Sequence, residues 1–274
     1  MALRFVEIVI KIYIIIRVHI ILKQMVDKLG DRIKSNYEDR TRYSLPRRTY
    51  TIIRLDGKAF HTYTSNLKKP FDMDLIEDMQ KATKYLCEHI QGCVMGYVQS
   101  DEISLLLTDF ATPTTDAWYD GNIQKIASVS ASMVTAIFNQ LRAEREFRAL
   151  AFFDSRTFTI ADRVEVMNYF IWRQKDATRN SVSMAAHHIC GHKATMGKSN
   201  SDKQEMLFQK GVNWNDYPVS AKNGSIVLRE TVEFESEANG KYVRNIWQAS
   251  GAPNFRTFLP TFLPTPELEV ETME

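Results

Sequence analysis

The chain has 274 residues, of which 44% are hydrophobic, so it can bury a substantial core as one large domain or as one domain with an appendage. Its 35 basic residues nearly balance its 33 acidic ones, which excludes the strong positive charge of a nucleic-acid coat protein and leaves only local contacts with RNA. The three cysteines, Cys87, Cys93 and Cys190, form no CxxC pair, which argues against a secreted disulfide framework and favours a cytoplasmic location.

The first 24 residues form an atypical N-terminal segment that is rich in isoleucine. It is interrupted by ionisable residues, namely Glu7, Lys11, Arg17 and His19. No uncharged stretch approaches the roughly 20 residues that span a bilayer, and no small-residue cleavage site follows an apolar run. We therefore expect no stable membrane partner and interpret residues 1–24 as upstream sequence read in frame, with Met25 as the natural start. A peripheral amphipathic anchor is the alternative.

Residues 25–160 alternate between helical and strand patterns. The predicted elements are a charged helix over 29–43 that Pro46 closes, a strand over 50–55, and a helix from the N-cap Asp72 to Ile90. Two apolar runs, at 94–98 and 103–107, flank the sequence QSDE and predict a hairpin whose turn carries Asp101 and Glu102.

A long helix is expected from about Asn122 to Arg145, followed by a fourth strand made of the runs 150–153 and 157–160 and broken at FDSR. The resulting order, βαββαβ, is the split βαβ arrangement of ferredoxin-like folds. We therefore predict an α+β fold for this part of the chain.

Residues 161–259 are expected to be mainly helical, with helices over 164–189 and 202–210. Asn239-Gly240 lies between two strand-like runs and marks a terminal hairpin. Residues 260–274 contain Pro260, Pro264 and Pro266 and an acidic end, so we predict an extended or flexible tail.

Asp56 ends the first predicted strand, within the sequence IIRLDGKAFH. Asp-Gly alone is typical of a turn. In a βαββαβ sheet, however, the end of strand one lies beside the start of strand three, where Asp101 and Glu102 are found. Neighbouring carboxylates raise one another's pKa unless a cation lies between them, and hard oxygen ligands suit Mg²⁺. The pattern thus indicates a site for Mg²⁺ ions, with two unrelated polar turns as the alternative.

Six motifs in this order closely resemble those of the tRNA-histidine guanylyltransferase family, and most closely its bacterial branch of 3′-5′ polymerases: RLDGKAFH, SDEISLLL, FDSR, NYFIWRQKDATRNS, DKQEMLF and GVNWND. The resemblance covers about residues 29–228. It implies a polymerase-like palm in residues 25–160, with residues 161–259 completing the nucleotide and tRNA site. It also implies nucleotide addition to the 5′ end of tRNA, with GTP and ATP as substrates, the acceptor stem as partner, and a dimer or tetramer as the homo-oligomer.

The resemblance also implies roles for particular residues. Two Mg²⁺ ions are expected on Asp56, the Gly57 carbonyl and Asp101, and Glu102 matches a catalytic acid beside them. The nucleotide is expected to contact Asp56, Gly57, Lys58, Ala59, Phe60, His61, Ser100 and Asp101. Lys125 and Lys203 match positions that contact triphosphate, and Lys69 and Asn213 match other positions of the nucleotide site.

One stretch departs from the family pattern. Better-known members carry a histidine and asparagines where this chain has Ala177, Thr178, Arg179, Asn180 and Ser181, and only Asn180 is kept. A pocket without dedicated polar partners discriminates weakly among bases. We therefore predict templated repair of truncated tRNA ends in place of strict guanosine addition.

Several further signals allow two interpretations. His187, His188, Cys190 and His192 could bind zinc, although structural zinc sites need four ligands at established spacings. Five aromatic residues could stack on bases, but their phasing favours core packing: Phe152, Phe153, Tyr169, Phe170 and Trp172. Four basic residues near the first strand could bind RNA phosphates or lie in solvent: Arg47, Arg48, Lys68 and Lys69.

Two other functions were weighed. A nucleotide cyclase would use the same palm and metals without RNA. A non-catalytic RNA-binding module needs exposed aromatic residues on strands one and three, whereas these strands end in acids.

Overall fold

The structure is a computed structural model that describes residues 28–236 and 240–266. It divides into two compact units, residues 1–43 and 44–274. In the first unit, α2 (Lys28–Ile33) continues into a π-helical turn over Lys34–Glu38 and a 3₁₀ turn over Asp39–Thr41. The predicted helix over 29–43 is therefore helical as far as Thr41. Residues 1–24, with their anchor and start-site interpretations, lie outside the described residues.

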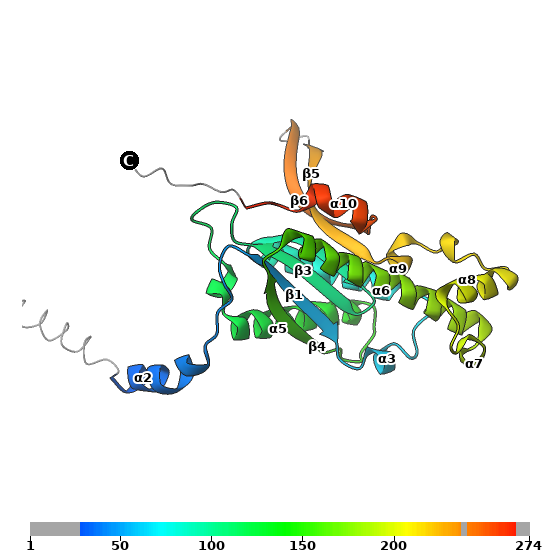
Figure 1. Cartoon of the computed structure of the whole chain (residues 1–274), viewed down its shortest axis with the longest axis horizontal. Coiled ribbons are helices and arrows are strands. Elements are labelled where there is room, and N and C mark those ends of the chain that lie inside the picture. Colours follow the sequence, from blue (N-terminus) through cyan, green and yellow to red (C-terminus); the bar gives the residue numbers. More distant parts are fainter. Residues whose placement is uncertain (1–27, 237–239, 267–274) are drawn as a thin grey trace, which may run out of the picture. The chain divides into compact units, whose positions relative to one another are not determined.

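The second unit is built on a sheet whose described strands follow the order β4-β1-β3-β2-β5-β6, as Figure 1 shows in part. Every neighbouring pair is antiparallel. The strands are β1 (Tyr50–Gly57), β2 (Cys93–Gln99), β3 (Glu102–Thr108), β4 (Phe153–Ile160), β5 (Ser225–Ser236) and β6 (Gly240–Gly251). The first four form the predicted ferredoxin-like sheet, with β1 beside β3 as expected.

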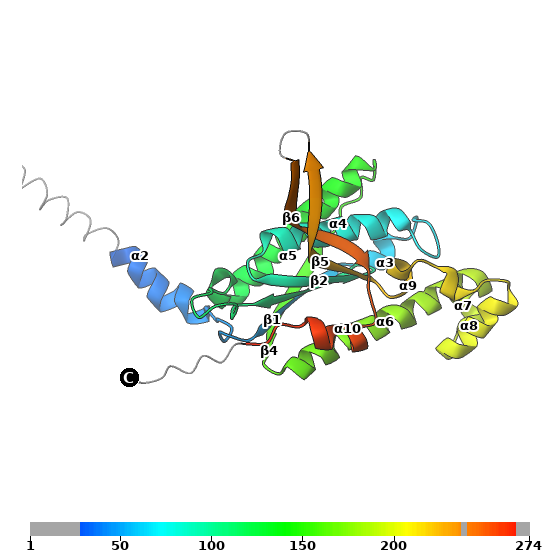
Figure 2. The same cartoon turned by 90° about the horizontal axis from the view of Figure 1, so that it is seen from above.

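Helices cover both faces of this sheet (Figure 2). On one face lie α4 (Met73–His89) and α5 (Ile123–Glu144), and on the other lie α6 (Arg163–Cys190) and α10 (Phe255–Phe262). Because strand side chains alternate, Ile53 and Leu55 pack in the core with α4 and α5. Ile52 packs in the other core, with α6 and α10. The result is a helix–sheet–helix sandwich.

The helix starts show N-capping chemistry, which the sequence predicted for Asp72. The Asp72 side chain accepts from the Leu75 N–H at the start of α4, and the Asn122 side chain accepts from the Lys125 N–H at the start of α5. Shorter helices complete the unit: α3 (Phe60–Tyr63), α7 (His192–Thr195), α8 (Asn200–Gln209) and α9 (Val219–Lys222). None of the helices in the described ranges is long and apolar enough to cross a membrane.

Three predicted boundaries need correction. The FDSR sequence does not break β4, since β4 begins at Phe153 and pairs with β1 throughout. Glu102 is the first residue of β3 and lies outside the turn. Pro260 lies inside α10, because buried Leu259 and Leu263 hold this helix against the sheet and Arg163 donates to the Pro260 carbonyl at 2.7 Å. The predicted extended tail therefore does not begin at Pro260, since α10 continues to Phe262. Residues 267–274 lie outside the described residues.

The terminal hairpin is confirmed, and it also enlarges the sheet. Residues 225–236 of β5 pair with 240–251 of β6, while β5 pairs with β2 at Gly96 and Val227. The approach of β5 to β2 depends on Gly224, whose φ is +82° and where a Cβ would lie 2.6 Å from the Val98 carbonyl oxygen. A larger residue there would push the hairpin away from the edge strand.

Candidate active site

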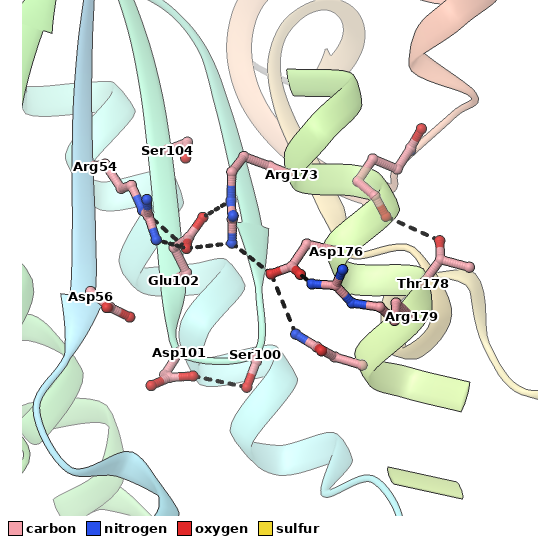
Figure 3. A network of polar contacts seen from close by, with 12 residues as sticks. Arg54, Asp56, Ser100, Asp101, Glu102, Ser104, Arg173, Asp176, Thr178 and Arg179 are labelled. Carbon is pink, nitrogen blue, oxygen red and sulfur yellow. Dashed lines mark hydrogen bonds and ion pairs between the residues drawn. The ribbon is translucent and has the colours of Figure 1, made fainter. Parts of the chain in front are cut away.

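Carboxylates gather at one end of the sheet, where β1 ends and β3 begins. In the β1–β3 ladder Asp56 lies opposite Glu102, and in the β1–β4 ladder it lies opposite Asp154. Asp101 occupies the turn between β2 and β3, after Ser100 with φ of 51°. Figure 3 shows Asp56 at the end of β1 and Asp101 in the adjoining turn. The predicted meeting of these acids is confirmed.

Asp56 and Asp101 have little positive charge around them. The ion-pair partner found for Asp56 is Arg156 at 4.0 Å, and both side chains are exposed. Asp101 forms no ion pair with any residue that the structure describes. Burial raises the pKa of Asp101, and the negative charges of Asp56 and Glu102 raise it further, while the hydrogen bond from Ser100 Oγ at 2.9 Å opposes this. A divalent cation would relieve the repulsion, so the oxygen ligands present fit Mg²⁺.

Glu102 has the opposite surroundings, although it is next to Asp101 in the chain. It is 5% exposed. Its Oε1 accepts from Arg173 Nε at 2.6 Å, and its Oε2 accepts from Arg173 Nη2 at 2.7 Å and pairs with Arg54 Nη2 at 2.8 Å. Figure 3 shows the carboxylate between the two guanidinium groups. Both oxygens are thus engaged, and Glu102 joins α6 to β1 and β3. Its predicted catalytic role stays a prediction.

The loop after β1 holds its backbone in a fixed shape. A Cβ on Gly57 would lie 2.2 Å from the Phe60 ring, so this position requires glycine. The Lys58 N–H donates to the Phe152 carbonyl at 2.8 Å. Ala59 adopts a left-handed conformation with φ of 54°, and its carbonyl accepts from the Thr62 and Tyr63 amides.

The side chain of Phe60 belongs to the core, where its ring lies 5.2 Å from that of Phe153 and 5.8 Å from that of Phe138. Only its backbone is therefore free to serve the predicted nucleotide site. The buried ring fixes the loop that carries Asp56 and His61.

A cleft of about 510 Å³ opens beside Asp101, a volume typical of ligand sites. Its lining includes five of the predicted nucleotide contacts, namely Phe60, His61, Lys69, Ser100 and Asp101. Lys69 Nζ donates to the Thr64 carbonyl at 2.9 Å. The cleft thus combines the carboxylate of Asp101, the positive charge of Lys69 and the backbone turns that carry His61 and Ser100.

The last turns of α6 line the same cleft with Met184, His187 and His188. The His187 and His192 rings lie 4.8 Å apart, and Cys190 Sγ donates to the Met206 carbonyl. Among the described residues no group of three or more His, Cys, Asp or Glu side chains is placed to hold a metal ion. Burial lowers the pKa of His187, and the charges of His192 and Lys203 lower it further.

A smaller cavity of about 70 Å³ adjoins this cleft, with which it shares Ser100 and Met184. It is also lined by Ala177, Asn180 and Ser181 of the stretch that departs from the family pattern. The sequence did not single out Met184, and it offered His188 only as a candidate zinc ligand, although both line the larger cleft. Their spacing from Ala177, at seven and eleven residues along one helix, is the signal that would have placed them on the same face.

Two predicted nucleotide contacts in the C-terminal part of the chain, Lys203 and Asn213, lie outside the cleft lining. Lys203 Nζ donates to Ser183 Oγ at 3.0 Å on the α8 side of α6. Asn213 caps its own turn, since its Oδ1 accepts from the Asn215 N–H at 3.0 Å. Both side chains would have to change partners to reach a bound nucleotide.

Within this chain, Lys125 lies away from the acids, and its predicted contact with triphosphate stays a prediction. Lys125 lies in the first turn of α5, and its Nζ is 5.7 Å from the centre of the Tyr119 ring. The next residue, Ile126, lines a cavity with Thr51 and Thr108, at the end of β1 and β3 remote from Asp56. Since β1 spans about 20 Å, tertiary placement of α5 separates Lys125 from the acids.

Comparison with known proteins agrees with this geometry. A family model described as tRNAHis guanylyltransferase matches residues 30–161. The tRNA(His) guanylyltransferase of Debaryomyces hansenii is 30% identical over 225 residues, which cover 72% of this chain and 81% of the relative. That of Schizosaccharomyces pombe is 28% identical over 203 residues, covering 68% and 76%.

Two solved structures are similar in fold. A bacterial tRNA(His) guanylyltransferase-like protein in complex with ATP has 42% identity and a TM-score of 0.75, and the match covers 84% of this chain and 96% of that one. Such a protein in complex with GTP has 42% identity and a TM-score of 0.73, with coverage of 86% and 99%.

An antiparallel ferredoxin-like sheet with acids gathered at one end matches the palm of nucleotidyltransferases. The sequence and structural matches make the family specific: the chain belongs to the tRNA-histidine guanylyltransferase family. The α+β palm fold, the family and the enzyme class predicted from the sequence are thereby confirmed.

Proposed function

We propose that this protein adds nucleotides to the 5′ end of tRNA in the 3′-5′ direction, with ATP and GTP as substrates and Mg²⁺ as cofactor. The observation that carries the proposal is the pair Asp56 and Asp101, which lie together beside a cleft of nucleotide size with only the distant Arg156, 4.0 Å from Asp56, as an ion-pair partner among the described residues. The ATP and GTP complexes of the bacterial relatives support the choice of nucleotides.

Asp56, the Gly57 carbonyl and Asp101 are the proposed ligands of two Mg²⁺ ions. Bound Mg²⁺ would neutralise phosphate charge and lower the pKa of the attacking hydroxyl. Ser100 orients the Asp101 carboxylate through its hydrogen bond. The backbone from Ala59 to His61, held by the buried Phe60 ring, would supply amides toward the phosphates, since the Lys58 amide is engaged with the Phe152 carbonyl. Lys69 adds a positive charge at the cleft.

The proposed reaction has two steps. The 5′-monophosphate of the RNA first attacks the α-phosphorus of ATP, or of GTP, which forms a nucleotidylylated end (adenylylated with ATP) and releases pyrophosphate. The 3′-hydroxyl of the incoming nucleotide then attacks the terminal phosphorus of the RNA, a new phosphorus–oxygen bond forms, and the bond to the activating nucleotide breaks. The protein contributes mainly alignment and electrostatic stabilisation.

Residues 177–181, which differ from the family pattern, make contacts that support templated repair. Thr178 Oγ1 donates to Asn223 Oδ1 at 3.0 Å, and Ser181 Oγ donates to the Lys222 carbonyl at 3.0 Å. These polar groups are engaged within the protein, which leaves few partners for reading a particular base. Pairing with the opposite acceptor strand would then supply the selectivity.

The test uses tRNAs that lack the first nucleotide and differ only in the base opposite the gap, each offered the four nucleotides separately. We expect each added nucleotide to pair with the facing base. Guanosine addition whatever the template base would overturn the repair proposal and leave a strict guanylyltransferase.

The alternatives and the wider context have their own tests. A non-catalytic RNA module is disfavoured because Tyr50, the aromatic residue of β1, is buried and β3 has none. A cyclase would release cyclic nucleotide without RNA.

The proposed homo-oligomer, a dimer or a tetramer, is tested by light scattering. The proposed cytoplasmic location is tested by cell fractionation.

A further inference from the structure

Trp172 is an exposed tryptophan beside the acid pair. Of the five aromatic residues predicted to pack in the core, Phe153, Tyr169 and Phe170 are buried there. The prediction is wrong for the other two, since Phe152 is 54% and Trp172 is 51% exposed. Trp172 lies on α6, on the face of the sheet where Asp56 ends β1.

The neighbours of Trp172 fix its position. Its ring centre lies 4.4 Å from Arg173 Cζ and 5.7 Å from Arg54 Cζ. Arg54 precedes Asp56 by two residues on the same face of β1, a step of about 7 Å. Figure 3 shows Arg54 and Asp56 on this face, with Arg173 on α6 beside them. Trp172 therefore covers Arg54, and the step from Arg54 to the proposed metal ligand Asp56 is comparable to the length of one nucleotide in a strand.

One exposed arginine near this ring is only weakly paired. Arg156 of β4 lies opposite Arg54 in the ladder and is well exposed. Its carboxylate partners are distant, with Asp154 at 3.6 Å and Asp56 at 4.0 Å. Arg54 and Arg173 are engaged with Glu102, whereas Arg156 keeps a guanidinium that can turn toward an incoming anion.

An aromatic face next to an exposed cation suits single-stranded nucleic acid, because a base stacks on the ring while its phosphate binds the cation. A purely structural role for Trp172, as a cover over the Arg54–Glu102 pair, requires the inner face of the ring but not the outer one. About half of the side chain is exposed, and Arg54, which the ring covers, lies two residues before Asp56 on the same strand.

We propose that the exposed face of Trp172 stacks on the terminal base at the 5′ end of the RNA and that Arg156 binds an adjacent phosphate. This inference rests on the proposed function, since it assigns the place of the RNA end within that site. The pair would position the end of the acceptor stem against the acids before the incoming nucleotide attacks.

The experiment compares Trp172→Ala, Trp172→Phe and the control Phe208→Ala, which removes an exposed ring on α8. Affinity for an acceptor-stem hairpin that lacks its first nucleotide is measured by fluorescence anisotropy, without Mg²⁺ or nucleotide. We expect Trp172→Ala to weaken RNA binding by about 10- to 100-fold. Trp172→Phe should stay within about threefold, because a smaller ring still stacks, and Phe208→Ala should match the wild type.

Two further measurements separate stacking from stability. RNA should quench the tryptophan emission of the wild type, and this quenching should be lost in Trp172→Phe, whose fold and RNA affinity are kept. Arg156→Gln should weaken binding similarly for all sequences and reduce the slope of log affinity against log salt by about one.

The outcomes distinguish this inference from the proposed function. Unchanged RNA affinity in Trp172→Ala, or unchanged quenching in Trp172→Phe, overturns the inference alone. A raised KM for the incoming nucleotide with unchanged RNA affinity would assign the stacked base to that nucleotide and also overturn it. A wild-type protein that neither binds nor extends the truncated tRNA overturns the proposed function itself.

Discussion

The carboxylates of Asp78 and Asp101 have opposite charges around them, arginines in the first case and other acids in the second. Asp78, between α4 and α5, is 1% exposed and accepts from Arg142 Nη1 at 3.0 Å and from Arg145 Nε at 2.8 Å. Asp101, at the sheet end, is also largely shielded from water, yet its charged neighbours are two further acids. A compensated acid holds two helices together, whereas an uncompensated one is available to bind a cation and substrate.

Glu102 shows that the contrast does not follow chain position. It is adjacent to Asp101, but its two arginines give it the surroundings of Asp78. Arg173 also pairs with Asp176, which in turn binds Arg179 on the next turn of α6. The acid pair is therefore backed by a charge network that fixes α6 against the sheet.

The largest expected effect concerns the uncompensated pair. Asp56→Asn and Asp101→Asn should each lower single-turnover extension of a truncated tRNA by roughly three orders of magnitude, because each removes a ligand charge. The melting temperature should stay the same or rise, since like-charge repulsion is removed. Asp116→Asn, at an exposed carboxylate, is the matched control. Near-normal turnover in either variant, with Mg²⁺ as the sole metal, would rule out the site.

The compensated acid should show the reverse behaviour. Asp78→Asn should lower the free energy of unfolding by about 3 to 5 kcal/mol, because Arg142 is left buried without its charge partner. The fraction that remains folded should keep its turnover. Denaturant unfolding measures this, with Glu88→Gln, from an exposed pair, expected to change stability by about 0.5 kcal/mol or less. A loss below about 1 kcal/mol for Asp78→Asn would contradict the structural role.

Replacing Glu102 should lower stability, as replacing Asp78 does, but by a smaller amount. Glu102→Gln should cost about 2 to 4 kcal/mol of stability, since two arginines lose their shared carboxylate. The Mg²⁺ concentration for half-maximal activity should stay unchanged, whereas Asp101→Glu, which moves a proposed ligand, should alter it. An altered Mg²⁺ requirement with unaffected stability would instead make Glu102 a metal ligand.

The smallest effect concerns the α6 side of the cleft. The pKa of His187 should lie below the ordinary value of 6.5, because burial and the positive charges of His192 and Lys203 disfavour its protonation. Since the folded-state pKa is depressed, this group contributes stability above the unfolded pKa and loses it as pH falls through the folded value. NMR titration of the imidazole should give a low midpoint that rises in His192→Gln. A midpoint at or above 6.5 would contradict this arrangement.

Local patterns in the sequence predicted the elements that depend on short-range chemistry. Asp72 and Asn122 begin α4 and α5 as N-caps, and the apolar alternation of 50–55 predicted β1. The meeting of Asp56 with Asp101 followed from the strand order, because antiparallel neighbours place one strand end beside the next strand start. These features need only the helix and strand periods and one topological rule.

Tertiary structure alone decided the rest. The sequence did not show that Arg54 and Arg173 neutralise Glu102, that β5 joins β2, or that Trp172 is exposed. Nor did it show that α5 carries Lys125 to the far end of the sheet. Each of these depends on contacts between residues far apart in the chain, where the packing of helices on the sheet sets which charges meet and which side chains face water. Residue type and spacing identified the acids. Only packing distinguished Asp56 and Asp101, the proposed cation ligands, from Glu102, which pairs with two arginines and stabilises the fold.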